Sequence, residues 1–475
     1  MKLIRLIHKN YTTMAKEVEK QDINPEKEAK EKTRAPEKIK VEAVPLENAV
    51  EALIDYGGFD LIKETIDGAG AMDPQAKARK NIFLTESAKK ADREKLKNSL
   101  LLWIEVISAH ENVADMISAS QEKSESATKL LNENLRKVFK ETRELETNYR
   151  SVALFYKNAE KDKIRNITIF NTDPEKLKDM ENTLVIDKIA AELKQNFDRL
   201  DLRENYSLLV IPGYLGSGQA VEKWAKIAYN NKVILITDFQ HLDDPEAVIE
   251  EFDLAGLTGG EIHKSNAIIT CNWIVGREKY AELDEEDHLF VPPSTALAGK
   301  IYSTLIAQPV AGKMHGGLSE VNGVKFELKK SEITELEKRG LVPMVHEWGK
   351  VMGMSAKTLY NGNDIGLQTY SVVRVFDYVA KVLIDFLNRQ AFVNWTPKVE
   401  KDLRMEIGRY LDSIKGHDKI IEAFSIIGLK QDKDTKIINL DIHITPFFPA
   451  KSFLLRLGGT KGNTAEEWVA EFSEK

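Results

Sequence analysis

The sequence predicts a multidomain protein of mixed α/β (α+β) class, with long N-terminal helices, a central α/β domain and a C-terminal helix-plus-hairpin domain. Three observations indicate this class. Apolar residues repeat at heptad spacing before residue 160, Ile/Val-rich runs alternate with amphipathic stretches after it, and two apolar helical stripes precede an alternating run near the end. The length of 475 residues suits about three domains.

Residues 1–45 are expected to form a flexible, charged N-terminal arm. From Lys16 to Glu42, 16 of 27 residues are charged, eight of each sign. Such a segment has too few apolar side chains to offset the entropy lost on ordering. Two interpretations stay open: an inert solvated tail, or an arm that becomes ordered on a partner.

Residues 46–160 are expected to be helical. Apolar side chains recur at 4-3 spacing, which predicts a helix from about 126 to 157 with one continuous apolar seam. The seam comprises Leu131, Leu135, Val138, Thr142, Leu145, Tyr149, Val152 and Tyr156, and Thr142 is its one polar member. So long a helix favours a helical pair or a partner helix, while packing within the chain stays open.

The central domain, residues 161–330, is expected to hold a largely parallel sheet. Buried strands are predicted in the runs KIRNITIF, NYSLLVIP, NKVILITDF and SNAIITCNWIVG, with helices around 184–199, 219–230 and 245–253. The C-terminal domain, residues 331–457, should contain helices at 370–391 and 397–415 and then a hairpin. The last residues, 458–475, are expected to be a tail.

Composition and motif content exclude several classes of function. Lys and Arg number 68 against 75 Asp and Glu, a net charge of −7, which gives no electrostatic attraction to nucleic acid. No apolar run is long enough for membrane insertion, so a cytoplasmic protein is expected. The lone Cys271 and the scattered histidines offer no metal-ligand spacing. We therefore predict no catalytic, cofactor-binding or metal-binding residues.

One glycine loop supports an alternative, a nucleotide-binding α/β enzyme. Gly213 to Gly218 lies between a predicted strand and a helix, and Asp238 ends the next strand, as a ribose-binding acid would. The spacing, however, is G-x-x-G-x-G and not the dinucleotide-binding G-x-G-x-x-G. A plain glycine turn is the preferred interpretation.

Residues 145–151, Leu-Glu-Thr-Asn-Tyr-Arg-Ser, resemble a helical motif of the large sheath subunit of type VI secretion systems, the TssC/VipB family. Tyr149 replaces the family's tryptophan and Ser151 its glycine. Residues 291–299, VPPSTALAG, are similar to the Pro-Pro…Ala-Gly segment of contractile tail sheaths. The resemblance runs from about residue 90 to 457. Its C-terminal third looks closer to phage-type sheaths, so a phage tail or another contractile injection system remains an alternative.

The resemblance implies a contractile-sheath fold and a structural, non-enzymatic subunit. It further implies that copies of the chain polymerise with a small sheath subunit around an inner tube protein and contract to drive the tube out of the cell. A baseplate and an AAA+ disassembly ATPase are implied as further partners. The heptad seam is the expected contact for the small subunit, and the alternating hairpin, taken as exposed, is a suitable contact for neighbouring copies. The interface residues so expected are Leu131, Leu135, Val138, Leu145, Tyr149, Arg150, Val152, Ile438, Leu440, Ile442 and Ile444.

Overall fold

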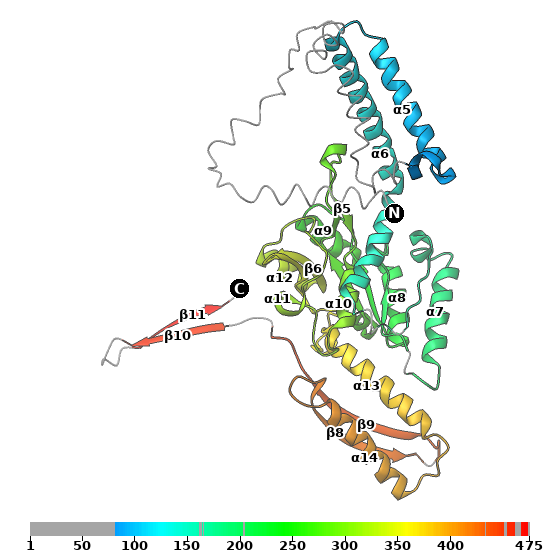
Figure 1. Cartoon of the computed structure of the whole chain (residues 1–475). Coiled ribbons are helices and arrows are strands. Elements are labelled where there is room, and N and C mark those ends of the chain that lie inside the picture. The colour runs from blue at the N-terminus through cyan, green and yellow to red at the C-terminus, as the bar shows by residue number, and fades with distance from the viewer. Residues whose placement is uncertain are drawn as a thin grey trace. The chain divides into compact units, whose positions relative to one another are not determined.

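The computed structural model describes residues 81–160, 164, 166–202, 205–432, 434–450, 454–460 and 467–473 (Figure 1). The predicted arm at 1–45 lies outside these residues. The chain divides into two compact units, residues 1–133 and 134–475. Each unit is described by itself below.

The described part of the first unit is helical. Helix α5 spans Lys90–Ser108, and α6, which continues into the second unit, spans Val113–Asn158. The predicted seam helix is therefore confirmed, and at 46 residues it is longer than predicted, about 69 Å. Its start is set by Asn112, whose Oδ1 accepts a hydrogen bond from the Asp115 amide at 2.9 Å.

The second unit is built around a five-stranded sheet with strand order β1-β2-β3-β6-β7. The strands are β1 (Leu208–Val210), β2 (Ile234–Asp238), β3 (Ala267–Cys271), β6 (Leu341–Glu347) and β7 (Lys350–Gly353). The first four are parallel, and β7 is antiparallel to β6. The predicted parallel sheet is confirmed.

Both faces of this sheet are covered, which explains the Ile/Val-rich character of its strands. On β2 and β3, Leu235 and Ile269 lie in one apolar core, while Ile236 and Ile268 lie in a second core on the opposite face. The first core is closed by α7 (Leu184–Phe197), α8 (Gly218–Asn230), α9 (Pro245–Ala255) and α12 (Lys330–Lys338). The second is closed by α10 (Ser294–Ser303), the end of α6 and the start of α13 (Tyr370–Arg389).

Two strand predictions are wrong. The described residues of 163–170 form no strand, and Ile167, Ile169 and Phe170 are exposed. An apolar run becomes a strand only where a neighbouring backbone pairs with it, and the sequence of the run does not supply that neighbour. The run at 265–276 is broken at Asn272, which has a left-handed φ of 65°, into β3 and a second strand, β4 (Ile274–Arg277). That strand pairs with β5 (Leu289–Val291) in a separate hairpin.

The C-terminal region holds the expected helices and hairpin. Helix α14 spans Pro397–Ile414, and strands β8 (Ile421–Gln431) and β9 (Ile438–Pro446) pair antiparallel. A third core joins α13, α14 and this hairpin. The expected tail instead contains part of a second antiparallel hairpin, β10 (Leu454–Thr460) with β11 (Glu467–Ser473). The short helix α11 (Gly312–His315) precedes α12.

Gly299 lets α10 touch the end of α6 at backbone distance. A Cβ at this position would lie 2.3 Å from the Phe155 carbonyl oxygen and 3.1 Å from the Ala159 nitrogen. Neither backbone atom can move without shifting α6. Close approach of the two helices therefore requires glycine here.

We expect Gly299→Ala to destabilise the second unit by roughly 1–3 kcal/mol because the added methyl group forces the two helices apart. Gly408→Ala in α14 is the matched control, since a Cβ there meets nothing within 4 Å. That control should stabilise the chain by up to about 1 kcal/mol through helix propensity. Urea unfolding measures whether each substitution lowers or raises the free energy of unfolding. Equal stability of the two variants would contradict the close contact.

Candidate functional site

Helix α6 is attached to the second unit by its polar side. Basic residues recur on it at seven-residue intervals, at Arg136, Arg143, Arg150 and Lys157. Seven residues make nearly two helical turns, so these side chains follow one side of the helix. They contact, in order, the Leu283 carbonyl oxygen and Asp284 carboxylate, the His288 carbonyl oxygen, the Gly276 carbonyl oxygen and the Glu320 carboxylate. We call this set the basic ladder.

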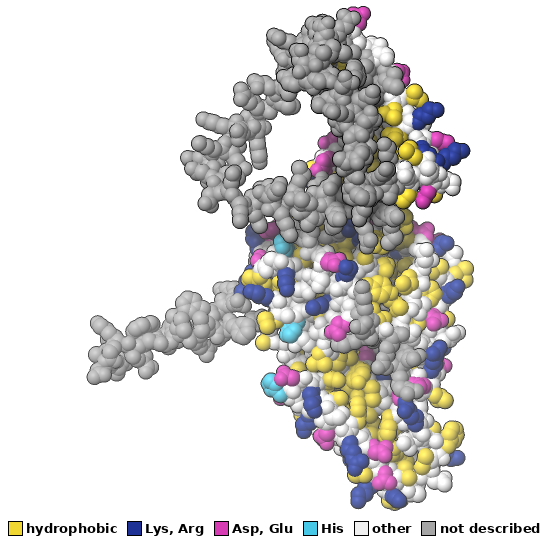
Figure 2. Space-filling model, in the orientation of Figure 1, with side chains coloured by type: hydrophobic (Ala, Val, Ile, Leu, Met, Phe, Trp, Pro, Cys, Tyr) yellow, Lys and Arg dark blue, Asp and Glu magenta, His cyan; other side chains and the backbone are white. Residues whose placement is uncertain are grey.

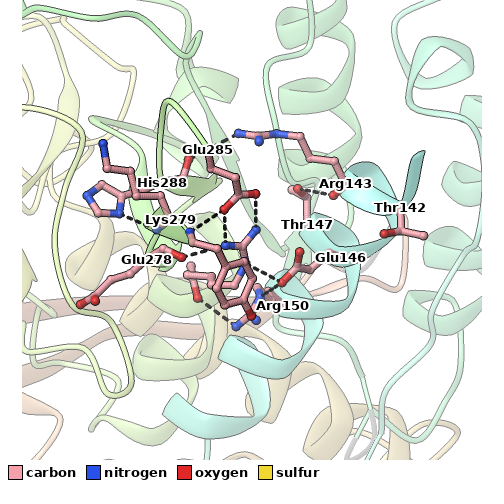
Figure 3. A network of polar contacts seen from close by, with 12 residues as sticks. Thr142, Arg143, Glu146, Thr147, Arg150, Glu278, Lys279, Glu285 and His288 are labelled. Atoms are coloured by element: carbon pink, nitrogen blue, oxygen red, sulfur yellow. Dashed lines mark hydrogen bonds and ion pairs between the residues drawn. The ribbon is translucent and has the colours of Figure 1, made fainter. Parts of the chain in front are cut away.

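A buried arginine, Arg277, completes the attachment, and Figure 3 labels residues of the surrounding network, among them Glu146, Arg150 and Glu285. Arg277, from β4, has only 8% of its side chain exposed and donates two hydrogen bonds to Glu285, at 2.7 and 2.9 Å. Its Nε also donates to Glu146 of α6 at 3.1 Å, and Glu146 accepts from Arg150 at 2.8 Å. The Tyr280 ring lies 4.2 Å from the guanidinium carbon. This network ties α6 to the β4–β5 hairpin.

The electrostatics of the network follow from this geometry. Hydrogen bonds from Arg277, with a further one from the Tyr280 amide, lower the pKa of Glu285 to about 2. Burial alone would lower the pKa of Arg277, but its bonds to Glu285 and Glu146 outweigh that effect and raise it. Both groups are therefore charged at neutral pH, as a buried pair must be to stabilise the contact.

A different side of α6 carries exposed apolar side chains. The exposed fraction is 55% at Val138, 70% at Leu145, 72% at Tyr149 and 42% at Val152, while Leu135 is half-buried. These five residues are called the α6 stripe. Thr142 lies within it and satisfies its hydroxyl by donating to the Val138 carbonyl oxygen at 2.7 Å. Leu131 continues the pattern toward the first unit and is also exposed.

Other predicted interface residues lie elsewhere. Arg150 belongs to the basic ladder, and its guanidinium is engaged within the chain. On β9 the predicted alternation is confirmed, but the expected exposure is wrong: Leu440, Ile442 and Ile444 pack against the core of α13 and α14. A strand that alternates apolar and polar residues buries its apolar face, and here the helices of the same chain cover that face. Ile438 is 38% exposed, and a partner contact for these strand residues stays a prediction.

The glycine loop is fixed in place by hydrogen bonds to the Asp238 carboxylate. The loop's Gly213 has φ 90° and donates its amide to Asp238 Oδ2 at 2.8 Å. The carboxylate also accepts from the Thr270 hydroxyl and from both the amide and hydroxyl of Ser294, the first residue of α10. Asp238 is fully buried, which raises its pKa despite these bonds. Four donors occupy the four acceptor positions of a carboxylate, so none is left for a ribose hydroxyl.

Neither a metal centre nor a membrane span is found among the residues that the structure describes. No group of three or more His, Cys, Asp or Glu side chains there is arranged to hold a metal ion. No helix there combines the length and apolar character needed to cross a bilayer.

Three family models match consecutive parts of the chain. Residues 46–135 match the TssC/VipB-like N-terminal region, residues 137–361 the type VI secretion system TssC/VipB central domain, and residues 369–474 the TssC/VipB-like C-terminal domain. The matches define a contractile-sheath protein. The chain belongs to the TssC/VipB family and is a sheath subunit of a type VI secretion system, as the motif at 145–151 predicts.

The solved structures to which the chain is similar include parts of contractile assemblies. The chain is 14% identical to a protein in the anti-feeding prophage baseplate, with a TM-score of 0.45, covering 63% of this chain and 84% of that one. The chain is also 14% identical to a protein of the contracted sheath complex of PVC, an extracellular contractile injection system. The TM-score is 0.44, and the match covers 66% of this chain and 80% of that one. A sheath tail protein from Desulfitobacterium hafniense is 12% identical, with a TM-score of 0.33, and the match covers 55% of this chain and 60% of that one. A comparison with curated proteins found no match.

We predict an acid-sensitive attachment of α6. Because the pKa of Glu285 is about 2 in the folded chain and 4.5 ordinarily, its stabilisation is present above about pH 4.5 and is lost as the pH falls toward 2. Glu285→Gln should cost about 2 kcal/mol near neutral pH, from weaker hydrogen bonds to Arg277, and progressively less below pH 4.5. Urea unfolding at a series of pH values measures this difference.

Glu286→Gln is the control for that series, because Glu286 is an exposed neighbour on the same hairpin. It should leave stability nearly unchanged at every pH. A constant deficit for Glu285→Gln across the whole range would contradict the ion pair as the cause.

Proposed function

We propose that the α6 stripe binds the small sheath subunit, and that the resulting pairs stack into a helical sheath around an inner tube in the cytoplasm. Contraction of this sheath would drive the tube outward. The observation that carries the proposal is that α6 is attached by its polar side and exposes an apolar one.

The exposed stripe supports a helical partner in particular. Figure 2 shows that apolar side chains are exposed elsewhere on the chain as well. Phe392 and Leu254 are two exposed examples. Those are single positions, and scattered exposed apolar residues need no explanation. The stripe instead repeats every three or four residues along one helix, which is the pattern that another helix fills with its own side chains. In the first unit, α5 also exposes Leu100, Leu101 and Leu102.

The attachment of α6 suits a subunit that moves as a rigid body. Four basic side chains and the Arg277 network connect the helix to the β4–β5 hairpin and the loop at Glu320. A partner held on the stripe would therefore move together with the central sheet when subunits rearrange. A baseplate that starts the sheath and an AAA+ ATPase that disassembles it complete the proposed set of partners. No step of this function requires bond-making chemistry by the chain.

We expect the double variant Val138→Asp, Leu145→Asp to lose co-purification with the small sheath subunit. Both side chains are more than half exposed, so the variant should keep its fold, whereas two carboxylates buried in an apolar contact are costly. Pull-down measures the pair, and electron microscopy of the co-expressed proteins should show no cylinders.

Lys137→Asp is the control, because Lys137 is exposed on the same helix and has no stripe residue three or four positions away. It adds the same kind of charge and should preserve both the pair and the cylinders. Normal co-purification of the double variant would mean that the small subunit binds elsewhere.

A further inference from the structure

A cavity of about 430 Å³ lies beside the middle of α13, where this helix passes from one core to another. Tyr370 and Val373 belong to the core on the central sheet, whereas Val379 and Leu383 belong to the core of the C-terminal hairpin. The opposite wall comes from the start of β2 and the residues before β1, including Ser207 and Lys232. The cavity is thus at the junction of the sheet domain and the C-terminal domain.

Positive charge is in excess in this cavity. Its charged lining comprises Lys232, Arg374, Asp377, Lys381 and Asp385. Asp385 is already engaged, since it accepts from the Leu202 amide at 3.0 Å and pairs with Arg389. Asp377 accepts from Asn266 at 2.8 Å and lies 4.0 Å from the Lys232 nitrogen. One available carboxylate therefore faces three cations.

Two of these cations are buried, and the charge of Asp377 favours only one of them, Lys381. Lys381 donates to the Tyr206 carbonyl oxygen at 2.7 Å, and burial lowers its pKa to about 8. Arg374 is only 8% exposed and makes one hydrogen bond, from Nη2 to the Ile301 carbonyl oxygen at 3.2 Å. Its Nη1 has no hydrogen-bond partner, and within the described residues no carboxylate lies at ion-pair distance from it. A buried guanidinium without a counter-charge is destabilising.

We propose that this cavity binds a small oxyanion, phosphate or a dicarboxylate, which neutralises Arg374 and Lys381 and fastens α13 to the edge of the central sheet. Arginine presents paired N–H donors that match the oxygens of both anions. Nη1 is covered in the structure, so binding is expected to turn the guanidinium toward the anion. Tyr378 and Ser207 supply neutral hydroxyl groups in the lining.

Thermal unfolding of the purified full chain tests the proposal. Sodium phosphate and sodium succinate are titrated separately against sodium chloride at matched ionic strength. We expect either oxyanion to raise the unfolding midpoint saturably by about 3 °C or more. Without an oxyanion, Arg374→Met should unfold at the same temperature as the natural chain or higher, because it removes an uncompensated charge. With an oxyanion it should gain nothing.

Two further variants keep the test decisive. Lys381→Met should weaken the anion effect, and it carries the test if Arg374→Met does not fold. Arg409→Met, an exposed arginine of α14, should respond like the natural chain. An equal anion response in Arg374→Met or Lys381→Met, or none in the natural chain, would overturn the proposal. A midpoint that rises with protein concentration but not with added anion would also overturn it, because a neighbouring copy's carboxylate would then supply the charge.

Discussion

The buried Arg277 pairs with both Glu285 and Glu146, and this contact determines which side of α6 faces the second unit and which side stays exposed. An amphipathic helix on a globular domain ordinarily buries its apolar face and exposes its polar one. Along most of its contact with the second unit, α6 does the reverse, because charged side chains make the attachment and the apolar stripe stays outside. Its apolar contacts with this unit are few: Leu154 and Phe155 pack against a core near its end, and the Phe139 ring lies against Tyr280. The polar attachment thus keeps an apolar surface available for a second protein.

Buried ionisable side chains recur in this molecule, and they are satisfied in different ways in different places. Asp238 is surrounded by four donors and fixes the glycine loop, β3 and the start of α10 to one another. Arg277 has two carboxylates within hydrogen-bond distance. Arg374 has neither arrangement, which sets it apart from the other two buried groups. Unpaired buried polar groups are costly, so a molecule or ion other than the chain itself is expected to supply the missing partner of Arg374.

Much of the fold could be predicted from periodicity, because long elements repeat their pattern several times. Helices at 184–199, 219–230, 370–391 and 397–415 appear within a few residues of their expected bounds. The strand at 163–170 failed because pairing depends on a neighbour that is remote in the sequence. The β10–β11 hairpin was missed because residues 458–475 carry little alternation. In the site, the stripe was visible as a seam, whereas the Arg277 network joins residues 131 positions apart and has no local pattern.

The acceptors of the basic ladder have a consequence for how this contact can change during evolution. Arg136, Arg143 and Arg150 donate to carbonyl oxygens of the backbone at Leu283, His288 and Gly276. Every residue type has a backbone carbonyl, so residues of the hairpin can be substituted during evolution while the arginines keep their acceptors. The pairs of positions joined only through these three carbonyl oxygens should consequently show little covariation among relatives. Methods that infer contacts from coupled substitutions would underestimate how firmly the helix and the hairpin are joined.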